Sequence, residues 1–232
     1  MLAHRNFQPW EGGEGAALGQ HVRAQLALGR EALKKTESEK RKAEIEAAVA
    51  HFESALTAPR NLGEAKHLLA NQSDIHYWLG VALDLLGEKK SAREHWRAAA
   101  NFKGDFQEMS VRAFSELTYY SALSLAKLGQ KSKAKKLLRD LLCHANELAK
   151  TTAKVEYFAT SLPTMLLFDD DGQFRQETTA LFLRAQAKLG LGRIAQARAL
   201  LKTVLQREPS HALAADLAQP QRPPNNEITL KP

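Results

Sequence analysis

Residues 76–100 read HYWLGVALDLLGEKKSAREHWRAAA, and two later segments share their pattern. These segments are TYYSALSLAKLGQKSKAKKLLRDLL at 118–142 and LFLRAQAKLGLGRIAQARALLKTVLQREP at 181–209. In each, an apolar pattern of helical period ends at a glycine, and a second helical pattern follows after a few residues. Glycine past a helix end supplies the left-handed backbone that other residues resist. Each segment is therefore predicted to be a helical hairpin.

The second helix of each hairpin has a small residue one turn before a large one, and the pairs are Ala92 with Trp96, Ala134 with Leu138, and Ala197 with Leu201. Residues four apart share a helix face, so the small residue admits a neighbouring helix and the large one fills the space beside it. Residues 42–59, KAEIEAAVAHFESALTAP, repeat this arrangement with Ala48 and Phe52. This degenerate copy brings the number of hairpins to four, above the roughly three needed to bury a continuous core.

The predicted fold class is all-α, an irregular α-solenoid of helical hairpins. Aromatic residues make up only 7% of the 232 residues, and glycine and proline are sparse between residues 16 and 215. The expected organisation is a lead-in at 1–15, a repeat domain at 16–215 with hairpins at about 16–59, 73–104, 110–148 and 175–209, and a flexible tail at 216–232.

The hairpin pattern resembles the tetratricopeptide repeat. Leu79, Gly80 and Leu83 stand where that repeat has its Leu-Gly pair and following large residue, while His76 replaces its usual Trp and Lys188 its usual Tyr in the last copy. The resemblance implies a right-handed superhelix whose concave groove binds an extended peptide or a partner helix.

Three further strings, at 4–26, 61–80 and 155–171, resemble the C-terminal helical part of a large, uncharacterised bacterial family. In that family a β-rich, sugar-binding-like domain precedes tetratricopeptide repeats. The resemblance implies that this chain is a fragment or a truncated relative, and that a β-rich domain of the same polypeptide is a possible partner. It carries over no catalytic residue.

The resemblance also selects candidate groove residues. One equivalent position holds an aromatic residue in all three hairpins, Tyr77, Tyr119 and Phe182. Polar groups expected nearby are Asp74, Asp84, Glu116 and Lys127. These aromatics either form a hydrophobic track for a partner or pack against neighbouring helices, and the sequence leaves both alternatives open.

The stretch FQPWEGGEG at 7–15 allows a second function, the edge of a carbohydrate-active enzyme. Trp10 could stack on a sugar ring while Glu11 and Glu14 accept hydroxyl protons, but the stretch lacks the context of a phosphate loop. The alternative is an N-terminal cap in which Phe7 and Trp10 cover the first hairpin.

The charge pattern raises a third function, RNA binding, because the chain has a net charge of +7. Candidate contacts are Lys127, Lys131, Lys133, Lys135, Lys136 and Arg139. Since Lys and Glu alternate in the charged runs and no aromatics interleave, solvated helix faces are favoured and a nucleic-acid partner is not expected.

Motifs for other chemistry are not found. The histidines show no ligand spacing, and FDDDGQF at 168–174 fails as a calcium loop, so that Asp169–Asp171 are expected to cap a helix near Gln173. Cys143 is expected in the core. No apolar stretch is long enough to cross a membrane. The sequence thus predicts a cytoplasmic, non-catalytic protein-binding scaffold with no cofactor or metal, and leaves its oligomeric state open.

Overall fold

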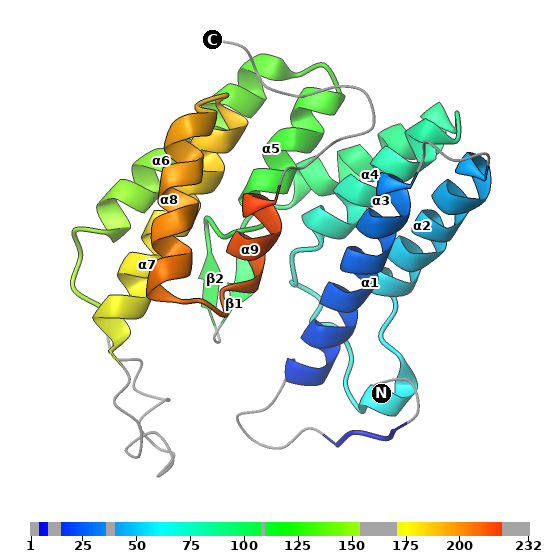
Figure 1. The fold of residues 1–232 in the computed structure, drawn as a ribbon, viewed down its shortest axis with the longest axis horizontal. Coiled ribbons are helices and arrows are strands. Elements are labelled where there is room, and N and C mark those ends of the chain that lie inside the picture. The colour runs from blue at the N-terminus through cyan, green and yellow to red at the C-terminus, as the bar shows by residue number, and fades with distance from the viewer. Residues whose placement is uncertain (1–4, 9–14, 36–39, 108–109, 154–170, 220–232) are drawn as a thin grey trace. The chain divides into compact units, whose positions relative to one another are not determined.

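A computed structural model describes residues 5–8, 15–35, 40–107, 110–153 and 171–219 (Figure 1). The described chain forms two compact units, which divide between Ala134 and Lys135. Each unit has its own packed helices and is described by itself.

Unit 1 is a row of helices in which neighbours along the chain pack together. The elements are α1 (Ala16–Lys34), α2 (Arg41–Leu56), the 3-10 helix η2 (Arg60–Leu62), α3 (Ser73–Leu85), α4 (Lys89–Asn101) and α5 (Thr118–Lys127). The first helices of successive hairpins also touch, α1 with α3 and α3 with α5 (Figure 1). A row of stacked hairpins, each contacting its neighbours, is the arrangement of a repeat protein.

Two close helix contacts of the same kind define the hairpins of unit 1. A Cβ atom added at Gly80 of α3 would lie 2.5 Å from Nε1 of Trp96 on α4, so only glycine admits the indole there. In the first hairpin Gly29 of α1 meets the ring of Phe52 on α2 in the same way. Both aromatic residues are buried. The degenerate first copy therefore has the same core contact as the second hairpin.

The turns between helices repeat as well. Gly87, Gly129 and Gly192 all have positive φ, at 86°, 82° and 78°. The residue after each glycine donates its N–H to a carbonyl five residues earlier, at 2.8–2.9 Å. This is the Schellman closure of a helix end, and it confirms the role predicted for the three glycines.

A small β-hairpin that the sequence did not predict lies between α4 and α5. Strands β1 (Asp105–Gln107) and β2 (Ser110–Arg112) are antiparallel, with Phe106 opposite Val111. Asn71 ties it to the start of α3, since its backbone N–H donates to Asp105 Oδ1 (3.1 Å) and its side chain donates to the Gly104 carbonyl (2.9 Å).

The segment between η2 and α3 has no regular secondary structure. It is a loop in which Leu68 is 99% exposed and Leu69 is 59% exposed. Its fixed points are polar instead: Glu64 accepts hydrogen bonds from the backbone N–H groups of Gly15 and Leu18 at the start of α1. The apolar residues here therefore do not anchor the loop.

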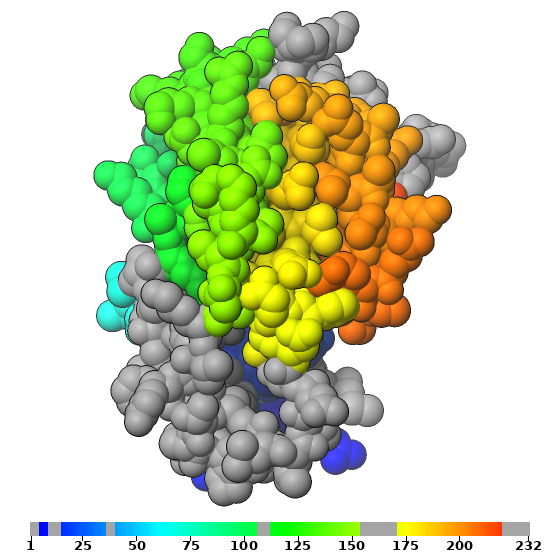
Figure 2. Space-filling model, turned by 90° about the vertical axis from the view of Figure 1, so that its left-hand side faces the viewer, coloured from blue at the N-terminus to red at the C-terminus, as the bar shows by residue number. Residues whose placement is uncertain are grey.

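Unit 2 contains most of α6 (Lys131–Leu148), then α7 (Gly172–Gly190), α8 (Ile194–Arg207) and α9 (Ala212–Ala218). α8 packs against both α7 and α9. Figure 2 shows α6, α7 and α8 on one face of this unit. The short helix α9 lies where the sequence suggested only the end of the repeats, and its N-terminus is capped by His211, whose ring accepts from the Ala214 N–H (3.2 Å).

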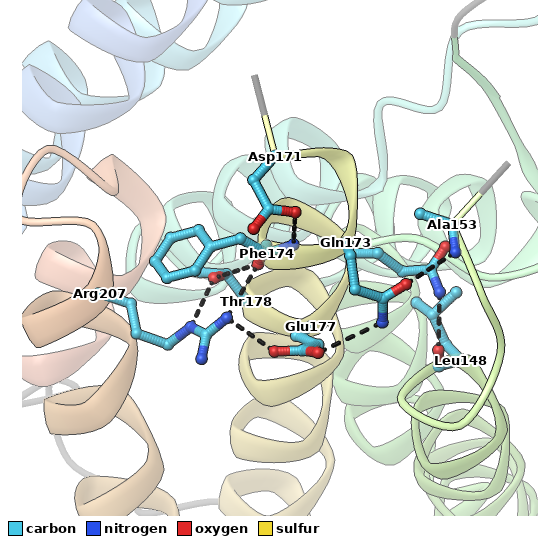
Figure 3. Close-up of polar contacts among 9 residues, drawn as sticks. Leu148, Ala153, Asp171, Gln173, Phe174, Glu177, Thr178 and Arg207 are labelled. Atoms are coloured by element: carbon cyan, nitrogen blue, oxygen red, sulfur yellow. Dashed lines mark hydrogen bonds and ion pairs between the residues drawn. The ribbon is translucent and has the colours of Figure 1, made fainter. Parts of the chain in front are cut away.

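The start of α7 is held by side chains from three directions (Figure 3). Asp171 caps the helix by accepting from the Phe174 N–H at 2.9 Å, as expected for an aspartate of FDDDGQF. Arg207 of α8 donates to Thr178 Oγ1 (2.9 Å) and pairs with Glu177 (2.9 Å), while its guanidinium lies 4.0 Å from the Phe174 ring centroid. Gln176 donates to the Leu148 carbonyl at the end of α6 (3.0 Å).

The predicted fold class, an all-α repeat of helical hairpins, is confirmed. The placement of Cys143 in the core was wrong, because its side chain is exposed. The buried positions of α6 are Ala134, Leu138, Leu141 and Ala145, and Cys143 falls between them on the opposite side of the helix.

Candidate partner-binding site

The three aromatic residues predicted to line a groove are buried. Tyr77 is 8% exposed, Tyr119 is 7% exposed and Phe182 is fully buried. Phe182, in unit 2, packs on the His211 ring at 4.6 Å between centroids. A track of three exposed aromatic faces is therefore not present among the described residues, and these rings serve as core.

In unit 1 the buried rings belong to a continuous series that crosses from α2 to α5. Its members, in spatial order, are Phe52, Trp78, Tyr77, Tyr120 and Tyr119, with centroid separations of 6.4, 5.3, 5.8 and 5.4 Å. Burial raises the pKa of the Tyr77 and Tyr119 hydroxyls, so both stay neutral at physiological pH. The series links α2, α3 and α5 through ring contacts.

The first polar group is a partly buried carboxylate, Asp74, at the start of α3. Burial raises the pKa of Asp74 to about 6. The N–H of Ile75, which donates to Asp74 Oδ1 at 2.8 Å, and the charge of Lys66 lower that pKa, whereas Asp105 adds to the rise. Desolvation of this carboxylate therefore outweighs the partners that it has.

Lys66 is held beside Asp74 by the backbone and by an amide. Its Nζ donates to the Ala55 carbonyl at the end of α2 (2.5 Å) and to Gln72 Oε1 (2.9 Å). Burial lowers the pKa of Lys66, and the charge of Asp74 partly offsets this effect. The ammonium thus joins the end of α2 to the start of α3 with two of its three N–H donors, while its charge acts on Asp74.

The second polar group lies near the other end of α3. Asp84 is exposed, and the Nζ atom of Lys127, on α5, lies 5.4 Å from the ring centroid of buried Trp96. Burial lowers the pKa of Lys127, while the Asp84 carboxylate partly offsets the shift. Asp74 and Asp84 are ten residues apart on one helix, which corresponds to about 15 Å.

A pair of histidines lies between α3 and α4. The Nδ1 atoms of His76 and His95 are 2.9 Å apart and the ring centroids 5.2 Å apart, so the rings meet edge to edge through these nitrogens. One Nδ1–H donates to the other nitrogen. Burial first, then the His95 and Lys66 charges, lower the pKa of His76 to about 4. The pair is thus neutral at physiological pH and joins the two helices of the hairpin.

The structure brings together some of the predicted site residues and adds others. Asp74, Tyr77, Asp84, Tyr119 and Lys127 all belong to neighbouring helices of unit 1, and Glu116 is partly buried just before α5. Sequence reasoning missed Lys66, because it lies in a loop, and Tyr120, because it is one place beyond the repeat position. Trp10, Glu11 and Glu14 of the sugar-edge alternative lie outside the described residues.

Comparison with known families supports the repeat assignment. The tetratricopeptide repeat family model matches residues 117–142 and 179–211. In these two segments the chain is similar to the tetratricopeptide repeat. The matched segments cover α5 with the first part of α6, and most of α7 with α8. No solved structure matches the chain. Tetratricopeptide repeats generally mediate protein–protein interactions and are typically non-catalytic scaffolds, whereas the bacterial family with a β-rich domain stays a prediction.

Among the described residues, no group of three or more His, Cys, Asp or Glu side chains is arranged to hold a metal ion. No helix in that part of the chain is both long and apolar enough to span a bilayer.

Proposed function

We propose that this protein is a non-catalytic scaffold that binds an extended segment of a protein partner along α3 and α5. The observation that carries the proposal is the charge of α3, which has two carboxylates, Asp74 and Asp84, and no Lys or Arg. One of these carboxylates is partly buried with incomplete compensation. A cationic group of a partner would supply the missing interaction.

The spacing of the carboxylates defines the partner segment. About 15 Å along α3 corresponds to four or five residues of an extended chain at roughly 3.3 Å per residue. The preferred ligand is therefore an extended peptide with Lys or Arg at two positions four or five residues apart.

The other segments of the chain have proposed roles as well. We propose that the helical repeats act in the cytoplasm, with 1–15 as a lead-in and the residues that follow α9 as a tail. A β-rich domain of the same polypeptide is included among the candidate partners, since an exposed basic strand would meet the same requirement. Trp10 with Glu11 and Glu14 stays a hypothesis for a carbohydrate-active context.

A fluorescein-labelled octapeptide library tests whether a basic peptide binds along α3 and α5. We expect selection of Lys or Arg at two positions four or five residues apart, and a loss of at least tenfold in affinity for Asp74→Asn combined with Asp84→Asn. The matched control is Glu46→Gln with Glu53→Gln on α2, which removes the same charge elsewhere in unit 1. Equal binding by both double variants, or no selection of basic peptides, would reject the proposed binding site on α3 and α5.

A further inference from the structure

The turn between α7 and α8, within unit 2, brings together three basic residues, Arg184, Lys188 and Arg193, here called the basic cluster. Arg184 and Lys188 lie one turn apart on α7, and Arg193 is the N-cap residue of α8. The Arg193 backbone N–H donates to the Lys188 carbonyl at 2.8 Å, and Lys188 Nζ donates to Gln196 Oε1, on the first turn of α8, at 2.6 Å. The basic cluster therefore belongs to one packed helix pair.

The charges of the basic cluster act on one another. Burial lowers the pKa of Lys188, and the charges of Arg193 and Arg184 lower it further, while no described carboxylate raises it. The side chain to which Lys188 donates, Gln196, is a neutral amide. The cluster is therefore a local excess of positive charge.

The two guanidinium groups have donors that the fold leaves unused. The Arg184 Nε atom is enclosed by protein and has no hydrogen-bond partner. Neither the Arg184 nor the Arg193 side chain makes an ion pair or a hydrogen bond with a described residue. Arg184 is partly buried and Arg193 is exposed, and arginine keeps its charge at any physiological pH. Their terminal N–H groups are therefore available to a ligand.

The carboxylates in the described part of unit 2 are engaged or lie on other elements. Glu177 pairs with Arg207 near the start of α7, and Asp171 caps that start. α8 contains no acidic residue. The remaining described carboxylates belong to α6, to α9 and to the residue after α8, and they are Asp140, Glu147, Asp216 and Glu208. The first two of these pair with lysines close to them in sequence.

The fold does not require cations at these positions. The equivalents of Arg184 and Lys188 in α3 are Leu79 and Leu83, and both are buried. A terminal repeat needs polar residues on its outer face for solubility, but neutral side chains or mixed charges meet that need. Like charges four residues apart destabilise a helix, and Arg184 and Lys188 are such a pair. An anionic ligand gives a physical reason for the cluster.

The start of α8 adds to the positive potential. Arg193, its N-cap residue, makes no side-chain hydrogen bond to the first turn. The N–H groups of a first helical turn carry a partial positive charge and favour an anion. In α7 this position holds Asp171, which accepts from the Phe174 N–H at 2.9 Å. One helix of the pair thus has its own anion, and the other has a cation in the same place.

We propose that the basic cluster and the first turn of α8 form a binding site for a phosphate group. A phosphate monoester has a charge of about −1.5 to −2 at neutral pH and three acceptor oxygens. These properties suit two guanidinium groups and an ammonium better than the single charge of a carboxylate does. The same group occurs on a phosphorylated Ser or Thr side chain of a protein partner and in free inorganic phosphate. A peptide probe and a free-ion probe distinguish these two sources.

Inorganic phosphate is the first probe. Its phosphorus NMR signal should broaden saturably when the full chain is added at neutral pH and constant ionic strength. Lys188→Gln with Arg193→Gln should remove this effect. The matched control, Arg41→Gln with Lys202→Gln, removes the same charge from exposed residues and should preserve it. Lys202 is nine residues further along α8 than Arg193, which corresponds to about 14 Å.

The second probe is a fluorescein-labelled Gly-Ser octapeptide with one phosphoserine. If the source is a phosphorylated partner, we expect it to bind at least about tenfold more tightly than the unphosphorylated peptide or one with glutamate at that position. The double variant of the cluster should lose this preference and its matched control should keep it. Arg184→Gln should weaken binding as well, and circular dichroism checks that each variant keeps its helices.

The outcomes separate the two sources and can overturn the proposal. Preference for the phosphopeptide, lost in the cluster variant, supports a phosphorylated partner, whereas binding of inorganic phosphate alone supports the free ion. No binding of either probe, equal binding of the glutamate peptide and the phosphopeptide, or equal losses in the variant and its control would overturn the proposal. The peptide contains no Lys or Arg, so Asp74→Asn with Asp84→Asn should leave its binding unchanged. This site can therefore fail independently of the binding site on α3 and α5.

Discussion

The first two hairpins of unit 1 share a core and differ at the surface. In both, a glycine of the first helix meets an aromatic ring of the second, Gly29 with Phe52 and Gly80 with Trp96. At the exposed positions next to the core, hairpin 1 has Val49 and Glu53 where hairpin 2 has Arg93 and Arg97. The comparison separates residues that make the fold from residues that are free to carry a function.

The largest loss of stability should come from removing the aromatic ring at the shared core contact. Trp96→Ala and Phe52→Ala should each lower the free energy of unfolding by about 3–5 kcal/mol. Trp96→Ala should cost more, because Trp96 Nε1 also donates to the Tyr77 carbonyl at 3.3 Å. Urea denaturation followed by circular dichroism measures both losses.

The outcome for Phe52 decides whether hairpin 1 is a true copy. A loss below about 1 kcal/mol for Phe52→Ala would show that this ring is not a core residue. Intrinsic fluorescence offers an independent signal from unit 1, because Trp10, Trp78 and Trp96 all precede Lys135.

The fold could be predicted from the sequence because its determinants are local. Gly87, Gly129 and Gly192 mark helix ends through backbone conformation, and the small and large pairs mark one helix face. The β-hairpin at 105–112 was missed because its two strands have only three residues each, too few for a period of two to stand out.

The site was less predictable, because burial depends on distant segments. The repeat position of Tyr77 left open whether its ring lines a groove or packs in the core, and its contacts with Trp78 and Tyr120 accompany a buried ring. The charge of Lys66 lowers the pKa of Asp74 from a loop without periodicity. Cys143 was misplaced because Leu141 and Leu142 before it suggested an apolar run, although its position lies opposite the buried residues of α6.

The second-largest effect should be a pH dependence of folding stability that arises in hairpin 2. The pKa of Asp74 is raised from 3.8 to about 6, so its contribution to stability is lost as pH rises through this range, by up to about 3 kcal/mol. The pKa of His76 is lowered from 6.5 to about 4, so its contribution is lost as pH falls. The two effects oppose each other between pH 4 and 6.5.

Single variants should separate the two contributions. Asp74→Asn should lose stability on acidification more steeply than the parent protein, whereas His76→Phe should gain stability as pH falls towards 4. The free energy of unfolding, measured in urea across this pH range, gives both slopes. Parallel curves for the two variants would show that neither group is coupled to folding.

A smaller loss of stability should follow from adding a methyl group at the glycines that contact aromatic rings. Gly80→Ala and Gly29→Ala force a methyl group into a buried ring, and we expect each to cost roughly 1–3 kcal/mol even after alanine's better helix propensity is included. Gly19, on the same helix as Gly29, has nothing within 4 Å of an added Cβ. Gly19→Ala should therefore stabilise unit 1 by about 0.5–1 kcal/mol. The same sign at all three positions in thermal denaturation would contradict the close helix contacts.

The smallest effect on stability should come from exchanging the surface positions. Val49→Arg with Glu53→Arg gives hairpin 1 the basic pair of hairpin 2, and the reverse exchange is Arg93→Val with Arg97→Glu. Because Glu53, Arg93 and Arg97 are exposed and Val49 only partly buried, each exchange should change the free energy of unfolding by less than about 1 kcal/mol. A larger change in stability for either exchange would mean that these positions belong to the core, and the separation between the two kinds of position would fail.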